Sequence, residues 1–219
     1  MKRDAGPAGE ALRIERNLFH HVMEQLVDGA AIYVYAGKRC TVRGNCTHSV
    51  RDEQVHAYYL DEQSADSTVE GNLAVNVPWP LHMHMASRCT IRGNVCVHTG
   101  NLSMSLANCD GFLIEGNILA AGGELRLSGS YTGVAQLRRN VLWSGAGAVR
   151  WDLHDRLPSL ERNADPVPLL PHHEQTIIAD PRVRCSVSGL ARLLPDPPAA
   201  ALGLCDLDVR QAGRRPPSA

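Results

Sequence analysis

Hydrophobic and polar positions alternate over short stretches between residues 14 and 152, and the pattern returns at a nearly constant interval. Each return contains an aliphatic residue, two further residues and an asparagine. The six asparagines are Asn17, Asn45, Asn72, Asn94, Asn117 and Asn140, separated by 28, 27, 22, 23 and 23 residues. An interval of this size is typical of solenoid proteins, in which each repeat is one structural unit stacked on the next.

Two strands are expected around each asparagine. The asparagine is usually preceded by a glycine, at Gly44, Gly71, Gly93 and Gly116. Gly-Asn between apolar stretches predicts a turn, because both residues tolerate left-handed backbone angles. Short runs rich in β-branched residues stand on both sides of the turn, as in residues 41–43 before Asn45 and residues 95–97 after Asn94.

A third strand precedes each such pair. These strands are expected over residues 32–35, 58–61, 81–85, 102–106, 124–127 and 149–152. Three short strands per repeat, with no helical periodicity between them, predict an all-β fold, a right-handed parallel β-helix of about six rungs. The asparagines are expected to form a structural ladder, in which each side chain hydrogen-bonds to its equivalent about 4.8 Å away on the next rung.

The leucine-rich repeat is the main alternative, because its consensus also ends in an asparagine and has a period of about 20 to 29 residues. That consensus requires leucine five and eight residues before the asparagine. The positions five residues before hold Cys40, Ser67, Cys89, Phe112 and Ala135. We therefore favour the β-helix.

Alternate side chains of the third strand point into the coil and away from it. The inward positions are mainly aliphatic or methionine, and include Leu81, Met83 and Met85. The outward positions are Tyr33, Tyr35, Tyr59, Asp61, His82, His84, Ser103, Ser105, Glu124, Arg126, Arg150 and Asp152. Solvent exposure alone predicts polar residues there, but this mixture of Tyr, Asp, His and Arg is typical of a carbohydrate-binding or catalytic groove.

Asp61 is the first candidate for a catalytic carboxylate, because neighbouring rungs place it within about 5 Å of the strand that holds His82 and His84. A carboxylate beside imidazoles can act as an acid or a base. Hydrolysis of a glycosidic bond commonly uses two carboxylates about 5 to 9.5 Å apart. The candidates for the second carboxylate are Glu62, Glu124 and Asp152.

These considerations assign two sets of site residues. The candidate catalytic residues are Asp61, His82, His84 and Glu124. The candidate substrate-binding residues are Tyr33, Tyr35, Tyr59, Glu62, Arg126 and Asp152. No metal site is assigned, because only Asp61 offers a third ligand to the histidine pair, although calcium binding remains an alternative.

Flanking residues extend this picture of the groove. Asp28 and the loop over residues 50–56, which ends in His56, are expected to form the groove walls and could supply the missing acid. Ser103 and Ser105 have no base on their own rung, so we do not expect a serine nucleophile.

Two segments, residues 28–34 and 57–64, and the Gly-Asn turns resemble right-handed parallel β-helix (pectate-lyase-like) carbohydrate-active enzymes. The nearest likeness is to the glycoside hydrolase family 141 type. Residues 179–181 and 192–213 resemble the closing segment of such enzymes, with Pro-Pro-Ala at residues 197–199 in place of the usual Ser-Pro-Ala. Because members of this group usually carry a longer N-terminal portion, the chain resembles the C-terminal part of such an enzyme.

The resemblance implies a glycoside hydrolase that acts on a plant or microbial polysaccharide. A polysaccharide lyase or uronate epimerase, in which Tyr or His abstracts a proton, is the first alternative, and a non-catalytic carbohydrate-binding β-helix is the second. The expected partner is a polysaccharide or oligosaccharide, and we expect a monomer without a cofactor. The resemblance also implies a secreted or periplasmic protein, although residues 1–16 lack the apolar stretch of a signal peptide.

Composition adds mainly exclusions. The 22 basic and 23 acidic residues nearly balance, which argues against a nucleic-acid partner, and no stretch of 18 apolar residues indicates a membrane span. The seven cysteines form no CxxC pair, so neither a zinc ribbon nor a complete disulfide framework is indicated, and most are expected to be small buried hydrophobic residues. Cys40 and Cys89 would lie two rungs apart, roughly 10 Å, too far for a disulfide.

The coil is expected to occupy residues 11–152, after an N-terminal extension over residues 1–10. Residues 153–213 include a stretch rich in proline and histidine, and we expect them to form an irregular covering segment. Residues 214–219 are expected to be a disordered tail.

Overall fold

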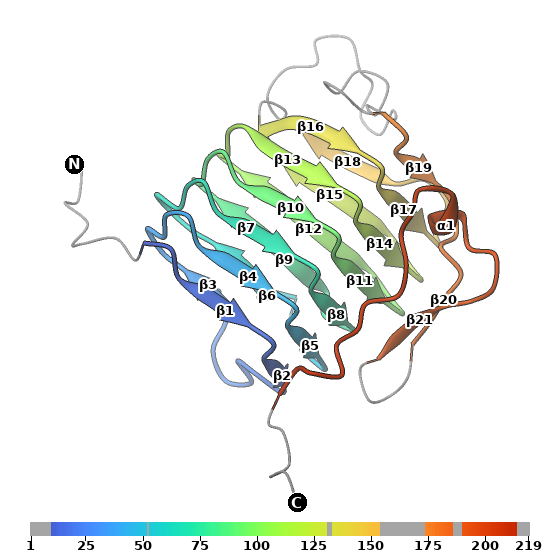
Figure 1. The fold of residues 1–219 in the computed structure, drawn as a ribbon, viewed down its shortest axis with the longest axis horizontal. Coiled ribbons are helices and arrows are strands. Elements are labelled where there is room, and N and C mark those ends of the chain that lie inside the picture. The colour runs from blue at the N-terminus through green and yellow to red at the C-terminus, as the bar shows by residue number, and fades with distance from the viewer. Residues whose placement is uncertain (1–9, 52, 131–132, 154–173, 186–189, 214–219) are drawn as a thin grey trace, which may run out of the picture.

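The strands up to residue 178 follow one another around a coil, and each pairs in parallel with the equivalent strands of the neighbouring turns (Figure 1). The computed structural model describes residues 10–51, 53–130, 133–153, 174–185 and 190–213. The predicted all-β parallel β-helix with three strands per rung is confirmed. In those ranges, no helix has the length and apolar character needed to span a membrane.

Three parallel sheets form the sides of the coil. The first sheet contains β1 (Arg13–Glu15), β4 (Thr41–Arg43), β7 (Thr68–Glu70), β10 (Thr90–Arg92), β13 (Phe112–Glu115) and β16 (Val134–Arg138). The second contains β2 (Leu18–His20), β5 (Cys46–His48), β8 (Leu73–Val75), β11 (Val95–His98), β14 (Ile118–Ala121), β17 (Val141–Ser144) and β19 (Ile177–Ile178). The third contains β3 (Gly29–Val34), β6 (Val55–Leu60), β9 (Trp79–His84), β12 (Leu102–Ala107), β15 (Leu125–Gly129) and β18 (Arg150–Leu153).

The predicted asparagine ladder runs along the corner between the first and second sheets. The side-chain amide and the backbone N–H of Asn45 donate to Oδ1 of Asn72 at 3.0 and 2.9 Å, and the same pair of bonds links every successive ladder asparagine. Gly-Asn turns allow the left-handed conformation at either residue, but none of the six ladder asparagines adopts it. The residue before each of them does so, as at Gly44 (φ 62°) and, where glycine is absent, Arg16 (φ 58°).

The coil interior holds the apolar residues that the alternation predicts. Leu81, Met83 and Leu125 of the third sheet are fully buried. Met85 was also expected inside but is 49% exposed. Because β9 ends at His84 and Met85 has a φ of 49°, the chain turns there and the alternation no longer holds.

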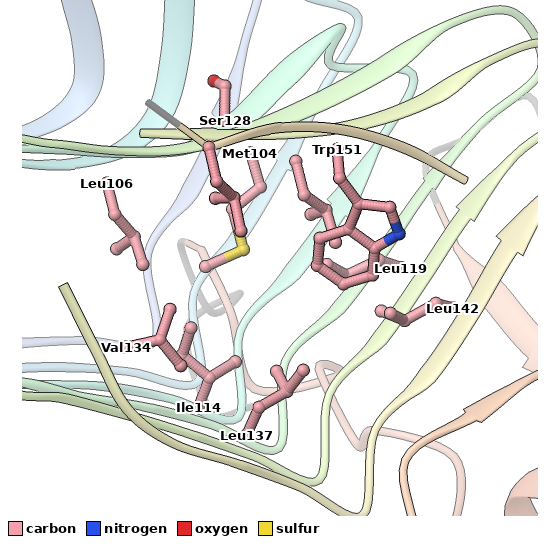
Figure 2. Close-up of a pocket in the computed structure, with 11 residues that line it drawn as sticks. Met104, Leu106, Ile114, Leu119, Ser128, Val134, Leu137, Leu142 and Trp151 are labelled. Carbon is pink, nitrogen blue, oxygen red and sulfur yellow. The ribbon is translucent and has the colours of Figure 1, made fainter. Parts of the chain in front are cut away.

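A small apolar cavity remains inside the last rungs of the coil. Its volume is about 30 Å³, and its lining includes Met104, Leu119, Val134 and Trp151 (Figure 2). Side chains from the three sheets converge on it from different directions. The described side chains therefore leave unfilled space at this end of the coil, and a larger apolar side chain placed there should raise the free energy of unfolding.

The C-terminal segment covers the outer face of the second sheet. The apolar outward residues of that sheet, among them Leu73, Val95 and Val141, pack against Ala199 of α1 (Pro198–Ala201) and against Val209. The hairpin of β20 (Val183–Cys185) and β21 (Ala191–Leu193) belongs to the same cover. The N–H of Gly213 donates to the carbonyl of Arg16 at 2.8 Å, so the segment reaches back to the first rung (Figure 1).

The segment is less irregular than predicted, since β19 adds one strand to the second sheet beside β17. Residues 154–173 of the predicted cover, most of the predicted N-terminal extension and the whole predicted tail lie outside the described residues.

Charges alternate along one outward column of the first sheet. The pairing register aligns Glu15, Arg43, Glu70, Arg92, Glu115 and Arg138. Arg92 lies 2.6 Å from Glu70, and Arg138 lies 3.1 Å from Glu115. Opposite charges on directly paired strands stabilise the pairing, and like charges in the same place destabilise it. The charged residues stand two positions before each ladder asparagine, so the column can be found from the sequence once the asparagines are aligned.

Candidate functional site

The candidate site lies on the outer face of the third sheet, over β3, β6, β9 and β12. The pairing register aligns Tyr33 with Tyr59, Tyr59 with His82, and His82 with Ser105. Asp61 directly follows β6, and since Leu60 pairs with Met83, Asp61 lies beside His84. The parallel sheet thus brings together residues that are more than 20 positions apart in the chain.

Asp61 is a hydrogen-bond acceptor at both of its carboxylate oxygens. Oδ1 lies 2.7 Å from Nδ1 of His84, and Oδ2 accepts a hydrogen bond from the hydroxyl of Tyr33. The side chain is largely buried, and burial by itself would raise the pKa of Asp61. The hydrogen bonds from Tyr33 and His84 outweigh the burial and lower the pKa of Asp61 below its ordinary value. Asp61 is therefore an ionised acceptor at neutral pH.

The contact with Asp61 fixes the orientation and the tautomer of His84. A carboxylate accepts hydrogen bonds and cannot donate them, so the proton of neutral His84 belongs on Nδ1. Nε2 then carries a free lone pair. The side chain is 29% exposed, so a ligand can approach it. A histidine oriented in this way by a carboxylate has the arrangement of a general base.

His82 has a different environment although it lies only two residues away on the same strand. Its ring is nearly parallel to that of His84, with an interplanar angle of 6° and centroids 6.3 Å apart. Nδ1 of His82 contacts the hydroxyl of Ser105. Burial, followed by the neighbouring His56 and His84, lowers the pKa of His82 to about 3. His82 is therefore neutral at physiological pH.

Aromatic rings surround His82. The ring centroids of His56 and Tyr59 each lie 4.4 Å from that of His82, and the centroid of Trp79 lies 5.2 Å away. Nδ1 of His56 donates to the carbonyl of Trp79 at 3.2 Å, and burial lowers the pKa of His56 to about 4. The predicted wall residue His56 is thus part of β6 and of the site itself.

Trp79 is a site residue that the sequence analysis missed. The signal that could have found it is an aromatic residue two positions before the expected start of the strand, where Pro80 suggests a turn. The strand in fact begins at Trp79.

Two tyrosines form the accessible part of the site. Tyr33 and Tyr35 are 47% and 44% exposed. The ring of Tyr33 also packs edge to face on Tyr59, with centroids 4.8 Å apart, and burial together with Asp61 raises the pKa of Tyr33. Such partly exposed rings are suited to stacking against an apolar surface of a ligand.

Two further carboxylates lie near Tyr33. The negative charges of Asp28 and Glu62 both contribute to raising the pKa of Tyr33. The backbone N–H of Glu62 hydrogen-bonds to the carboxylate of Asp61, and the side chain of Glu62 is half-buried, whereas Asp28 is exposed. The site around Asp61 therefore has an excess of negative charge.

The remaining predicted site residues form a separate cluster on β15 and β18. Nη2 of Arg126 lies 2.6 Å from Oδ2 of Asp152, and Arg150 contacts both Asp152 and Glu124 at 3.5 Å. Because β15 is three strands beyond β6, Glu124 lies roughly 14 Å from Asp61 along the coil axis alone. The structure brings neither Glu124 nor Asp152 to Asp61, nor Arg126 to the histidine pair.

The observed register does not align Ser103 with His82 and Ser105 with His84, as matching the outward residues of the two strands in order would do. Ser105 pairs with His82 of β9. Ser103, two residues earlier on β12, pairs with Arg126 of β15 on the opposite edge of the strand.

The described residues contain no group of three His, Cys, Asp or Glu side chains placed to hold a metal ion. None of the seven cysteines forms a disulfide, all of them lying within the described ranges.

The comparisons of the chain with models of protein families, with curated proteins and with solved structures find no match. The resemblance to β-helix carbohydrate-active enzymes accordingly rests on the residues of this chain alone. What the site does has to be inferred from its geometry.

Proposed function

We propose that the protein is a carbohydrate-active enzyme, a glycoside hydrolase, with its active site on the outer face of β3, β6 and β9. The observation that carries the proposal is the 2.7 Å contact between Oδ1 of Asp61 and Nδ1 of His84. It leaves Nε2 of His84 as a base that can remove a proton from an attacking water molecule.

Asp61 has a supporting role in this proposal. The sequence suggested an acid, base or nucleophile, but both oxygens of Asp61 accept hydrogen bonds and its lowered pKa keeps it ionised. An ionised carboxylate cannot protonate a leaving group. Asp61 instead orients His84 and stabilises the positive charge that His84 gains with the proton, as a carboxylate does for the histidine of a catalytic triad.

The leaving oxygen of a glycoside needs a proton from an acid on the other side of the sugar ring. Glu62 in its protonated form is our candidate for this acid, because it is half-buried and lies close to Tyr33. Attack by a water molecule that a base has activated inverts the configuration at the sugar carbon. We therefore propose an inverting hydrolysis.

Tyr33 and Tyr35 supply the platform for the sugar chain. Both are exposed on the same face as Asp61 and His84. Aromatic rings bind the apolar C–H faces of sugars without requiring a charge on the ligand.

The excess of negative charge favours hydrolysis of an uncharged chain over elimination from a uronate. A lyase has to neutralise the uronate carboxylate with a cation. Arg126 and Arg150 both form ion pairs with Asp152. They lie on β15 and β18, the second and third strands beyond β9, and so away from the histidine pair. Asp28 and Asp61 would repel a uronate instead.

The test is an activity screen with neutral polysaccharides and with polyuronates. We expect new reducing ends from a neutral polymer, without the ultraviolet absorbance of an unsaturated uronide. His84→Ala should lower the rate by about 100-fold or more. An absorbing product would establish the lyase, and a His84→Ala enzyme as active as the wild type would remove His84 from the mechanism.

A further inference from the structure

We infer that Ser105 is a positioning residue, which makes His82 a neutral hydrogen-bond donor to the substrate and so gives it the opposite role to His84. The inference rests on the proposed function of the same face. By strand alternation alone, His82 and His84 are equivalent, because both occupy outward positions of β9.

The contact between Ser105 and His82 joins adjacent strands. Ser105 lies on β12 directly opposite His82 in the register, and its hydroxyl contacts Nδ1 of the imidazole. Ser105 is only 3% exposed. Water therefore cannot readily replace His82 as the partner of this hydroxyl.

The direction of the hydrogen bond follows from the surroundings of Ser105. No other hydrogen-bond partner of its side chain is present in the described part of the structure. If Nδ1 of His82 carried the proton, the serine hydrogen would be buried without an acceptor, which is unfavourable. The serine hydroxyl therefore donates to Nδ1, and the imidazole proton belongs on Nε2.

The groups around His82 keep it neutral. His56 and Tyr59 approach it from β6, Trp79 and His84 from its own strand, and Ser105 from β12. None of these five is an anion at neutral pH. The carboxylate of Asp61, which is engaged by His84 and Tyr33, raises the pKa of His82, but by less than burial, His56 and His84 lower it.

The two parallel imidazoles thus receive partners from opposite directions along the coil. Asp61 on the preceding rung makes Nε2 of His84 an acceptor, and Ser105 on the following rung makes Nε2 of His82 a donor. A donor and an acceptor on rings 6.3 Å apart can hold a sugar oxygen and a water molecule side by side. In this arrangement His82 binds the substrate while His84 transfers the proton.

The test combines ¹⁵N NMR of the histidine rings with kinetics. In the wild-type protein we expect the Nε2–H tautomer of His82, with no titration between about pH 5 and 8. Without the Ser105 hydroxyl, Nε2–H should no longer be the fixed tautomer of His82, and Ser105→Ala should raise KM roughly 10-fold with little change in kcat. Ser105→Thr, which keeps the hydroxyl, should restore both the tautomer and KM. Ser103→Ala, on the same strand and face but paired with Arg126, is the matched control.

Three results would overturn the inference: an Nδ1–H tautomer of His82 in the wild type, unchanged NMR signals and kinetics in Ser105→Ala, or labelling of Ser105 by a fluorophosphonate, which would identify a nucleophile. If the wild type cleaves no polysaccharide, the hydrolase proposal fails, and the NMR measurement still decides whether Ser105 sets the tautomer.

Discussion

Asp61 and His84 are 23 residues apart in the chain, yet Oδ1 of the carboxylate lies 2.7 Å from Nδ1 of the imidazole. The contact exists because β6 and β9 pair in parallel with Leu60 opposite Met83. His84 is the last residue of β9 and Asp61 directly follows β6, so the parallel pairing of these two strands positions both side chains.

Replacing the carboxylate tests this relationship. Asp61→Asn preserves the size of the side chain but removes its charge, so His84 loses the partner that fixes its tautomer. We expect kcat to fall by about 100- to 10,000-fold, with a circular dichroism spectrum like that of the wild type. Asp152→Asn, on the same face but paired with Arg126, is the control and should keep nearly full activity.

Acid should weaken the fold through His82. Its pKa is lowered from 6.5 to about 3, so below about pH 6.5 the unfolded chain binds a proton that the folded protein does not. The contribution of His82 is fully present above pH 6.5 and is lost as the pH falls toward 3. Urea unfolding at pH 7 and pH 4.5 should show a smaller difference for His82→Gln than for the wild type.

The asparagine ladder should be most sensitive in its middle. Asn94→Ala removes the oxygen that accepts from both the backbone N–H and the side chain of Asn72, and both donors are buried. We expect a loss of about 3 kcal/mol in the free energy of unfolding. Asn17→Ala should cost only about 1 kcal/mol, because the side chain of Asn17 donates to the ladder while its Oδ1 accepts from no described residue. Equal losses in the two variants would contradict this account of the ladder.

The apolar cavity of about 30 Å³ can be filled by one methylene group. Val134 lines it, and Val134→Ile should raise the free energy of unfolding by about 1 kcal/mol in urea titrations. Val69→Ile introduces the same methylene at a fully buried position of β7 that does not line the cavity, and it should be destabilising. A destabilised Val134→Ile protein would show that the cavity cannot accept the added group.

The fold could be predicted from the sequence because one signal, the spacing of the asparagines, repeats along the coil. The candidate site could be predicted only in part. Strand alternation correctly put Asp61, His82 and His84 on one face, but it cannot decide which residues of neighbouring rungs align, since that depends on the length of each turn. This is why Ser105 went unrecognised as the partner of His82.

His56 shows a second limit of alternation. It is two residues from Tyr58, whose hydroxyl donates to the carbonyl of Leu73 at 2.9 Å inside the coil. The ring of His56 nevertheless contacts Tyr59 and His82 on the outer face. The strand pairing is interrupted between His56 and Tyr58, opposite Pro80, which has no N–H to offer. Such an interruption depends on the neighbouring strand and is invisible in the segment itself.

The alternating charges on the first sheet give the coil a longer repeat than its backbone has. The backbone and the asparagine ladder repeat every turn, but the column from Glu15 to Arg138 repeats every two. Deleting the single turn that contains Arg92 would bring Glu70 against Glu115, whereas deleting two successive turns would leave every pairing complementary. Insertion or deletion of turns in pairs therefore preserves the charge complementarity of the column. The backbone fold alone would tolerate a change of one turn equally well.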